Sequence, residues 1–276
     1  MLEWLLGLGA VGWFLYAVNR EKKRPKRRQI HCHIEFVDEG DYLDLMVHNA
    51  YGVEITASFK WKVLKGVRPE GEPPTLAVIP GFDSVSVARL WKVSRKPLYS
   101  VDWEWVWGSA EAHHTPGTIY QLPFEPGSTF TVSQGPGGSF THKGESYHAV
   151  DFDMPIGTPV LAARAGVVAD VERDFRTKVL NREAGGNYVL VQHEDGTVAE
   201  YFHLKMDGVV VDPGTEVEAG DLIGYSGNTG CSAGPHLHLM VFRAVDGSRR
   251  ESLSMRFKPR GASVAAPLET GKSYTA

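Results

Sequence analysis

The sequence predicts an all-β protein in which an amino-terminal membrane-spanning helix precedes two antiparallel β-units. Thirty glycines and sixteen prolines separate short β-rich runs along the 276 residues, a distribution typical of tight turns between strands. The carboxy-terminal half shows no helical period. Apolar residues make up 42% of the chain, which is ordinary for a globular protein with room for two modest domains.

Residues 1–19, MLEWLLGLGAVGWFLYAVN, are apolar apart from Glu3 and Asn19. As a helix they are long enough to cross a hydrocarbon core of about 30 Å. A cleavable signal peptide would begin with basic residues and end at a small-residue site, and the segment has neither. A buried amphipathic helix is the alternative, but apolar residues on every side argue against it. We therefore expect a transmembrane anchor over 1–19.

A basic juxtamembrane segment, 20–29, follows the anchor. Its first nine residues, REKKRPKRR, hold seven basic side chains and one acidic one, which attract anionic lipid headgroups by about 1 kcal/mol per basic residue. The positive-inside rule would keep this segment, and the protein body with it, on the cytoplasmic side. After residue 28 the chain has 22 basic and 31 acidic residues, a formal charge of −9, which argues against nucleic-acid binding.

Residues 30–110 predict an accessory β-sandwich. Runs such as HCHIEFV, DYLDLMVHN and VEITASFKWKVL alternate in polarity and are separated by Gly, Pro, Asn and Asp. Three tryptophans at every second position share one strand face, as a packed aromatic face or as a sugar-binding platform; they are Trp103, Trp105 and Trp107. Cys32 and Cys231 fall in no C-x-x-C motif, so we expect no disulfide.

The domain that follows carries the motifs. We expect a linker over 111–126, the second β-domain over 127–246, and a tail over 247–276 that contains one strand-like piece, LSMRFK, and is poorly ordered at its end. NYVLVQHEDGTVAEYFHL predicts a β-hairpin that turns at Glu194–Gly196. His193 stands at that turn, where we expect it to face solvent.

GCSAGPHLHLMVFR, residues 230–243, places His236 and His238 two positions apart in an apolar, strand-like run. Successive side chains of a strand alternate faces, so both imidazoles point to one side, about 6.5 Å apart along the strand. Imidazole is the commonest neutral zinc ligand in proteins. Two solvated histidines on an edge strand are the alternative. Further histidines and a carboxylate in TVAEYFHL and YHAVDFDMPIGTP favour the metal site.

Together these segments resemble the lysostaphin-type (LytM-like) zinc endopeptidases, which cut the peptides of bacterial cell walls. The resemblance covers roughly residues 134–243 and rests on AVDFDMPIGTPVLAARAGVV, GGNYVLVQH, YFHL, VEAGDLIGYSGNTG and GPHLH, in the family's order. It implies a zinc-dependent endopeptidase of peptidoglycan cross-links or bridges on an antiparallel β-sheet. It also implies that Asp151 and His238 bind Zn²⁺ and that His203 and His236 are the unligated catalytic pair. Strand geometry alone leaves open which of His236 and His238 binds the metal.

The third zinc ligand departs from the family's H-x-x-x-D pattern, because Tyr147 stands four residues before Asp151. His148, three residues before Asp151, would face the other side of a regular strand unless a bulge intervenes. His142, nine residues before Asp151, could reach the metal from a glycine-containing loop, and its placement resembles that in some family members. We predict His142 as the ligand and His148 as the second choice; a site without either histidine is the third possibility.

Two further residues near these motifs each have two interpretations. Tyr201 shares a strand face with His203, where it either donates to an oxyanion or packs as a core aromatic. Asn187, in GGNYV, either hydrogen-bonds substrate or marks a turn.

Three functional classes follow from these patterns. The first is the zinc endopeptidase. The second is a non-catalytic relative that binds wall or activates a partner hydrolase, and the third is a membrane-tethered adaptor whose structural zinc would need a closed four-ligand shell. The histidines and Asp151 favour the enzyme. A wall peptidase works in the cell envelope or periplasm, which conflicts with the positive-inside prediction, and we give the resemblance more weight.

Overall fold

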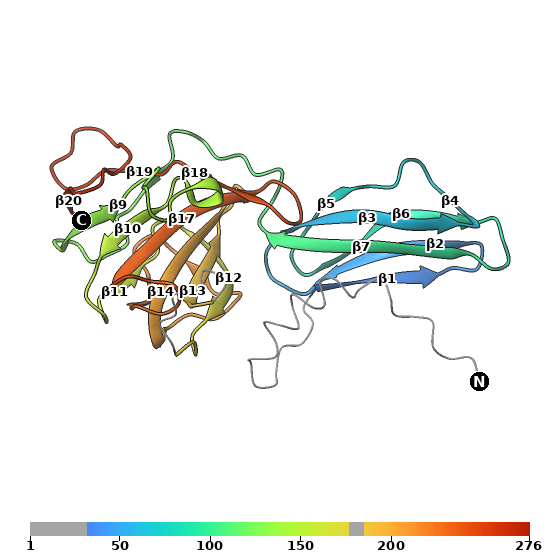
Figure 1. Cartoon of the computed structure of the whole chain (residues 1–276), viewed down its shortest axis with the longest axis horizontal. Coiled ribbons are helices and arrows are strands. Elements are labelled where there is room, and N and C mark those ends of the chain that lie inside the picture. Colours follow the sequence, from blue (N-terminus) through green and yellow to red (C-terminus); the bar gives the residue numbers. More distant parts are fainter. Residues whose placement is uncertain (1–31, 177–184) are drawn as a thin grey trace. The chain divides into compact units, whose positions relative to one another are not determined.

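The computed structural model describes residues 32–176 and 185–276. Within these residues every regular element is a β-strand apart from one 3-10 helix, η1 (Gly144–Ser146), which confirms the all-β prediction. The chain divides into two units (Figure 1). The first extends to Val106 and includes Asp246–Ser248, and the second comprises Trp107–Val245 and Arg249–Ala276.

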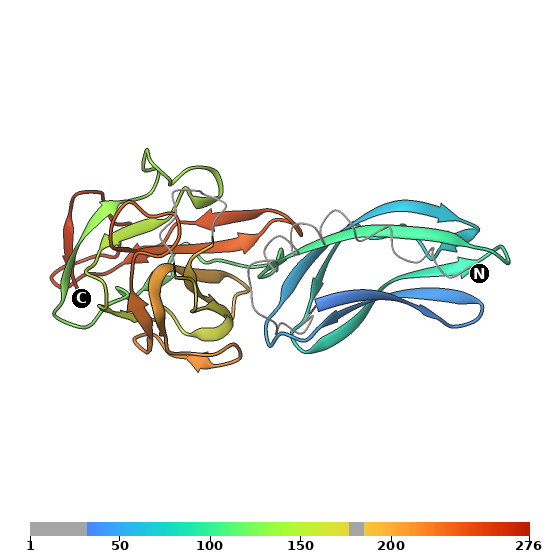
Figure 2. The same ribbon diagram turned by 60° about the horizontal axis from the view of Figure 1, so that its bottom comes forward.

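The first unit contains a four-stranded and a three-stranded sheet, which Figure 2 shows as separate layers. The first sheet has the order β1 (Cys32–Asp38), β2 (Tyr42–Asn49), β6 (Asp83–Lys92), β4 (Val67–Pro69), and the second β5 (Leu76–Ile79), β3 (Ile55–Lys65), β7 (Leu98–Trp107). Buried and half-buried side chains alternate along β2, as expected for a strand with one face on a core. The core cluster of Leu43, Val67 and Leu90 packs with Trp61, Leu64 and Tyr99 of the other sheet, so it lies between the sheets.

The second unit is built on one large sheet. Its strand order is β15 (Glu216–Val217), β12 (Gly166–Glu172), β13 (Asn187–Gln192), β14 (Val198–Val209), β17 (His236–Ala244), β10 (Val150–Asp153), β9 (Thr129–Gln134), β20 (Ser273–Thr275). β16 (Leu222–Ser226) pairs with β14 and β11 (Pro159–Leu161), and β18 (Arg250–Leu253) pairs with β17. The predicted hairpin is present as the antiparallel pair β13–β14.

Strand pairing brings the central motifs together. β17 lies between β14 and β10, and its His238 stands opposite both Phe202 and Asp151. β10 and β17 pack one face on a large apolar core, in which Val150, Phe152, Leu237 and Leu239 are almost completely buried. The polar residues between them therefore share the other face of the sheet.

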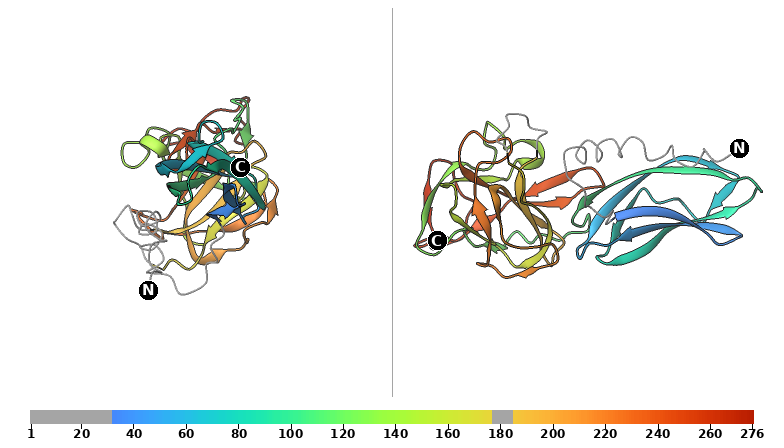
Figure 3. Two further views of the ribbon diagram at one scale, coloured as in Figure 1. Left: turned by 90° about the vertical axis from the view of Figure 1, so that its right-hand side faces the viewer. Right: turned by 90° about the horizontal axis from the view of Figure 1, so that it is seen from below.

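The expected linker and tail are part of this second unit. Tyr120, Leu122 and Phe124 are buried in its core, and β8 (Ile119–Tyr120) pairs in parallel with β19 (Arg256–Phe257). The expectation of a poorly ordered tail end is wrong, because β20 pairs with β9 and Leu268 is buried. Figure 3 shows the carboxy terminus beside β9. The apolar residues of both segments are scattered along the sequence, and they form part of the core only because they contact residues far away in the chain.

No helix within the described residues is long and apolar enough to cross a membrane. The anchor expected over 1–19 and the basic segment over 20–29 lie outside the described residues. The two cysteines are free, with Cys32 buried and Cys231 half-buried.

Candidate metal centre and active site

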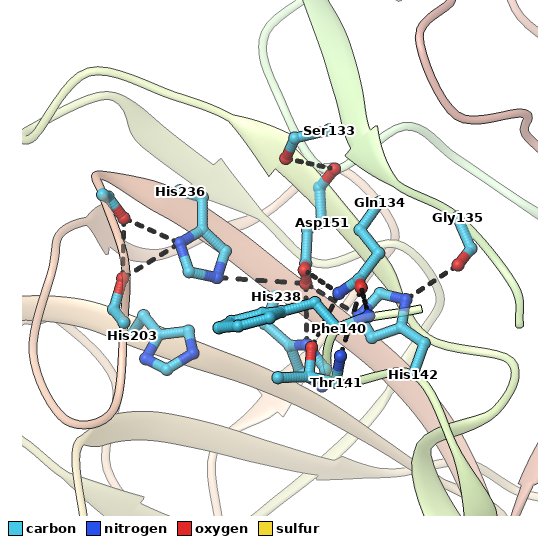
Figure 4. Close-up of polar contacts among 12 residues, drawn as sticks. Ser133, Gln134, Gly135, Phe140, Thr141, His142, Asp151, His203, His236 and His238 are labelled. Atoms are coloured by element: carbon cyan, nitrogen blue, oxygen red, sulfur yellow. Dashed lines mark hydrogen bonds and ion pairs between the residues drawn. The ribbon is translucent and has the colours of Figure 1, made fainter. Parts of the chain in front are cut away.

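Three side chains from two strands and a loop converge on one point of the second unit (Figure 4). Asp151 on β10 is directly opposite His238 on β17, and side chains opposed across an antiparallel pair lie on the same face. The Nδ1 of His238 is 2.8 Å from the Oδ1 of Asp151. The Nε2 of His142, from the loop before η1, is 3.1 Å from the same oxygen. One ligand atom from each of the three lies within 4.8 Å of the others.

A hydrogen bond to the backbone orients the His142 ring. Its Nδ1 is 2.9 Å from the carbonyl oxygen of Gly135, and a carbonyl can only accept, so Nδ1 carries the proton and Nε2 holds a lone pair. The side chain is completely buried, and Nε2 makes no hydrogen bond even though it faces Asp151. A buried acceptor without a donor is costly unless something else satisfies it. A metal ion would do so.

His148 lies outside this cluster. Its backbone N–H donates to the Ser252 hydroxyl, and its ring packs against Tyr147. Burial lowers the pKa of the His148 imidazole. The structure thus brings His142, and not His148, to Asp151 and His238, because the chain between Gly135 and η1 folds back over the end of β10.

His203 and His236 form a pair beside the three clustered residues. Their ring centroids are 4.5 Å apart, and the Nε2 of His236 is 3.9 Å from the Oδ1 of Asp151. The Nδ1 of His203 donates to the carbonyl of Thr229, and that of His236 to the carbonyl of Gly234. Both rings are therefore held in the tautomer whose Nε2 can accept a proton.

The backbone and electrostatics of His203 are unusual. Its φ is 64°, a left-handed conformation that is uncommon outside glycine and often marks functional sites. Burial, with the neighbouring His236 and His238, lowers the pKa of His203 to about 3. Burial acts to raise the pKa of Asp151, but the hydrogen bond from the His238 imidazole outweighs it and holds that pKa below its usual range. The carboxylate is therefore ionised and the His203 ring neutral at pH 7.

Comparison with known proteins identifies this region. Residues 145–250 match the model for Peptidase family M23. The second unit contains a peptidase M23 domain. The match includes Asp151, His203, His236 and His238, and begins after His142. The matched residues lie within the region whose motifs resemble the lysostaphin-type peptidases.

Several curated proteins are similar to this M23 domain. Peptidoglycan DD-endopeptidase ShyA of Vibrio cholerae is 41% identical over 92 residues, 33% of this chain and 19% of that protein. Lysostaphin of Staphylococcus simulans is 41% identical over 96 residues, 34% of this chain and 18% of that protein. An uncharacterized metalloprotease of Buchnera aphidicola is 39% identical over 102 residues, 37% of this chain and 24% of its own length. The chain thus spans a quarter or less of these relatives.

The solved catalytic domain of Staphylococcus simulans lysostaphin is 29% identical, over 45% of this chain and 87% of that domain, with a TM-score of 0.33.

Two residues with open interpretations are structural. Tyr201 is completely buried, and its hydroxyl accepts a hydrogen bond from the backbone N–H of Ala163 at 2.7 Å, so it is a core aromatic. The buried side-chain amide of Asn187 bonds both backbone groups of Phe175 and the carbonyl of Leu204. Asn187 thereby joins two segments of the M23 domain.

The expectation that His193 faces solvent is wrong. Its side chain is buried, its Nδ1 donates to the carbonyl of Ala165 at 2.8 Å, and its ring contacts the Tyr120 ring edge-on. Burial lowers the pKa of His193 to about 4. The turn is covered by the segment around Tyr120, which belongs to the region expected to be a linker.

None of the sequence motifs singles out Gln134 as a site residue. It is the last residue of β9, pairs with Asp151 in the sheet register, and donates to Asp151 Oδ2 at 2.9 Å. No local pattern marks a single glutamine as a partner of a carboxylate 17 residues later. Only the pairing of β9 with β10 places the two side chains together.

Proposed function

We propose that this protein is a zinc-dependent endopeptidase that hydrolyses peptide cross-links or bridges of bacterial peptidoglycan. The observation that carries the proposal is the convergence of His142, Asp151 and His238 beside the paired rings of His203 and His236. The names of the relatives, a peptidoglycan DD-endopeptidase and lysostaphin, support a substrate in the cell wall.

The three clustered residues fit zinc. Two imidazole nitrogens and one carboxylate oxygen are a donor set that catalytic zinc sites use, with a further position left for water or substrate. Zinc bonds of about 2.0–2.1 Å in tetrahedral geometry separate neighbouring donors by roughly 3.3 Å, close to the 2.8 and 3.1 Å separations from Asp151 Oδ1. The unsatisfied Nε2 of His142 is the further sign that this atom has a metal partner.

When bound, zinc polarises the scissile carbonyl and lowers the pKa of a water molecule. Asp151, His142 and His238 would hold it. His203 and His236 remain outside that shell, and each has an Nε2 able to accept a proton because its Nδ1 is bonded to a carbonyl. We assign them the transfer of a proton from the attacking water to the leaving amine, with the neutral state of His203 favoured by its lowered pKa.

The other parts of the chain complete the proposal. We infer that the first unit is an accessory β-sandwich that positions the peptidase, and that residues 1–19 anchor the protein in a membrane with the M23 domain in the cell envelope. Protease protection of the full chain in intact cells and in permeabilised cells tests that placement. Degradation only after permeabilisation of the inner membrane would contradict it.

The activity is tested with the full chain purified in detergent. Zinc content is measured by elemental analysis, and release of peptides from purified peptidoglycan is followed by mass spectrometry. We expect one zinc per chain and cleavage that Asp151→Ala abolishes. Stoichiometric zinc without cleavage of glycyl bridges or D-alanyl cross-links would instead support the non-catalytic alternative.

A further inference from the structure

The Gln134 side chain connects Asp151 to the loop that bears His142. Its Nε2 is 2.9 Å from Asp151 Oδ2 and 2.6 Å from Thr141 Oγ1. Its Oε1 accepts hydrogen bonds from the backbone N–H groups of Phe140 at 3.0 Å and Thr141 at 3.2 Å. Figure 4 shows the amide between the carboxylate and this loop. All four hydrogen-bonding positions of the amide are therefore used.

This network admits only one orientation of the Gln134 amide. If the amide were flipped, its oxygen would face the Asp151 carboxylate and its NH₂ group would face two backbone N–H donors. Both contacts would be repulsive, and the two backbone N–H groups would lose their acceptor. The amide is thus a fixed donor to Asp151 and a fixed acceptor for the loop.

The bond to Oδ2 leaves Oδ1 of Asp151 as the oxygen that faces both ligand histidines. His142 and His238 approach Oδ1, at 3.1 and 2.8 Å, while Gln134 occupies Oδ2. Because the donor is a neutral amide, it orients the carboxylate without neutralising its charge. A cationic partner would compete with a metal ion for that charge.

Gly138 provides the space that the Gln134 side chain needs. A Cβ atom at position 138 would lie 2.2 Å from Gln134 Cγ and 2.7 Å from its Cδ. These atoms are the middle of the side chain, so even an alanine at 138 would force Gln134 away from Asp151. The backbone at Gly138 has no left-handed φ, so an alanine there conflicts with Gln134 and not with its own backbone.

We propose that Gln134 is a positioning residue for the metal site. It orients Asp151 so that Oδ1 is free to bind the metal, and it holds the His142 loop against the same carboxylate. The absence of a side chain at Gly138 leaves room for Gln134 to do so. The inference rests on the proposed function above. Gln134 does not touch the reacting atoms. Outer-shell partners of this kind are worth about 10–100-fold in metal affinity.

The test measures zinc affinity of the full chain by competition with a fluorescent chelator. We expect Gln134→Leu and Gln134→Glu to weaken zinc binding about 10–100-fold, the first by removing the donor and the second by placing a carboxylate against Asp151. Gln121→Leu, at an exposed glutamine of the same unit, is the matched control and should bind as the unchanged protein does. Excess zinc should restore kcat in Gln134→Leu with an unchanged KM.

A double-mutant cycle separates positioning from general destabilisation. Gly138→Ala alone should weaken zinc binding as Gln134→Leu does, because it displaces the same side chain. In a Gln134→Ala background, Gly138→Ala should change the affinity less than about twofold, because Cγ is no longer there; the two effects are then strongly non-additive. Additive effects in the cycle would overturn the role assigned to Gly138 and Gln134.

The outcomes distinguish this inference from the proposed function. If the unchanged protein binds no zinc, the metal site itself is wrong, and the role of Gln134 with it. If the unchanged protein binds zinc and both Gln134 variants bind it equally well, only the positioning role is wrong. Melting temperatures of the metal-free variants identify any that fail to fold, and Gly138→Ala then provides the test without altering Gln134.

Discussion

The Nε2 of His142 lies 3.1 Å from the Oδ1 of Asp151, although nine positions separate the two residues along the chain. His142 therefore lies where the histidine of the family's H-x-x-x-D pattern would be expected to lie in space, although it is nine residues from Asp151 and not four. The loop between β9 and η1 carries His142 back over β10, and the bond from His142 Nδ1 to Gly135 turns the free nitrogen toward the carboxylate. A metal site can thus be completed without a histidine at position 147.

Replacing His142 should remove the metal, whereas replacing His148 should not. We expect His142→Ala to weaken zinc binding by more than about 100-fold, because even outer-shell partners are worth about 10–100-fold. His148→Ala is the matched control, and its zinc content should equal that of the unchanged protein. Elemental analysis after dialysis checks both, and full zinc content in His142→Ala would refute the assignment.

Loss of a proton-transfer histidine should separate zinc binding from catalysis. Asparagine tolerates the left-handed backbone of residue 203, so His203→Asn should fold and keep zinc. Its kcat for peptidoglycan cleavage should fall about 10²–10⁴-fold. Cleavage assays with zinc-saturated protein measure this, and a kcat near that of the unchanged protein would exclude His203 from proton transfer.

Tyr201 should matter for stability and not for chemistry. Tyr201→Phe removes the acceptor of the Ala163 N–H and leaves a buried donor unpaired, which costs about 1–3 kcal/mol. Denaturant unfolding should show that loss, with kcat unchanged at a temperature where the variant is folded. A fall in kcat at unchanged stability would instead restore the oxyanion interpretation.

The burial of His193 should make the protein sensitive to acid. Its pKa is lowered from 6.5 to about 4 in the folded state, so between these values the unfolded chain binds a proton that the folded chain does not. Stability then falls as the pH decreases through this window, by about 3 kcal/mol in total.

His193→Gln removes that titration. The difference in unfolding free energy between His193→Gln and the unchanged protein, measured on metal-free samples, should therefore move in favour of the variant as the pH falls from 6.5 to 4. A constant difference would mean that His193 is not buried in its neutral form.

Local patterns in the sequence determined the strands and placed His236 and His238 on one strand face. The two-residue period of GPHLH places His236 and His238 on the same side wherever the strand lies, and turn residues around Glu194–Gly196 define the hairpin. Both follow from backbone geometry over a few neighbouring residues. The order of the motifs likewise indicated a lysostaphin-type peptidase domain.

Tertiary structure alone decided which distant residues and strands come together. His142 reaches Asp151, Gln134 reaches its other oxygen, His193 is buried under Tyr120, and the tail strand closes on β9. Each of these contacts joins residues that no local periodicity relates. They depend on strand order and on how loops fold over strand ends, and those depend on burial of the whole core.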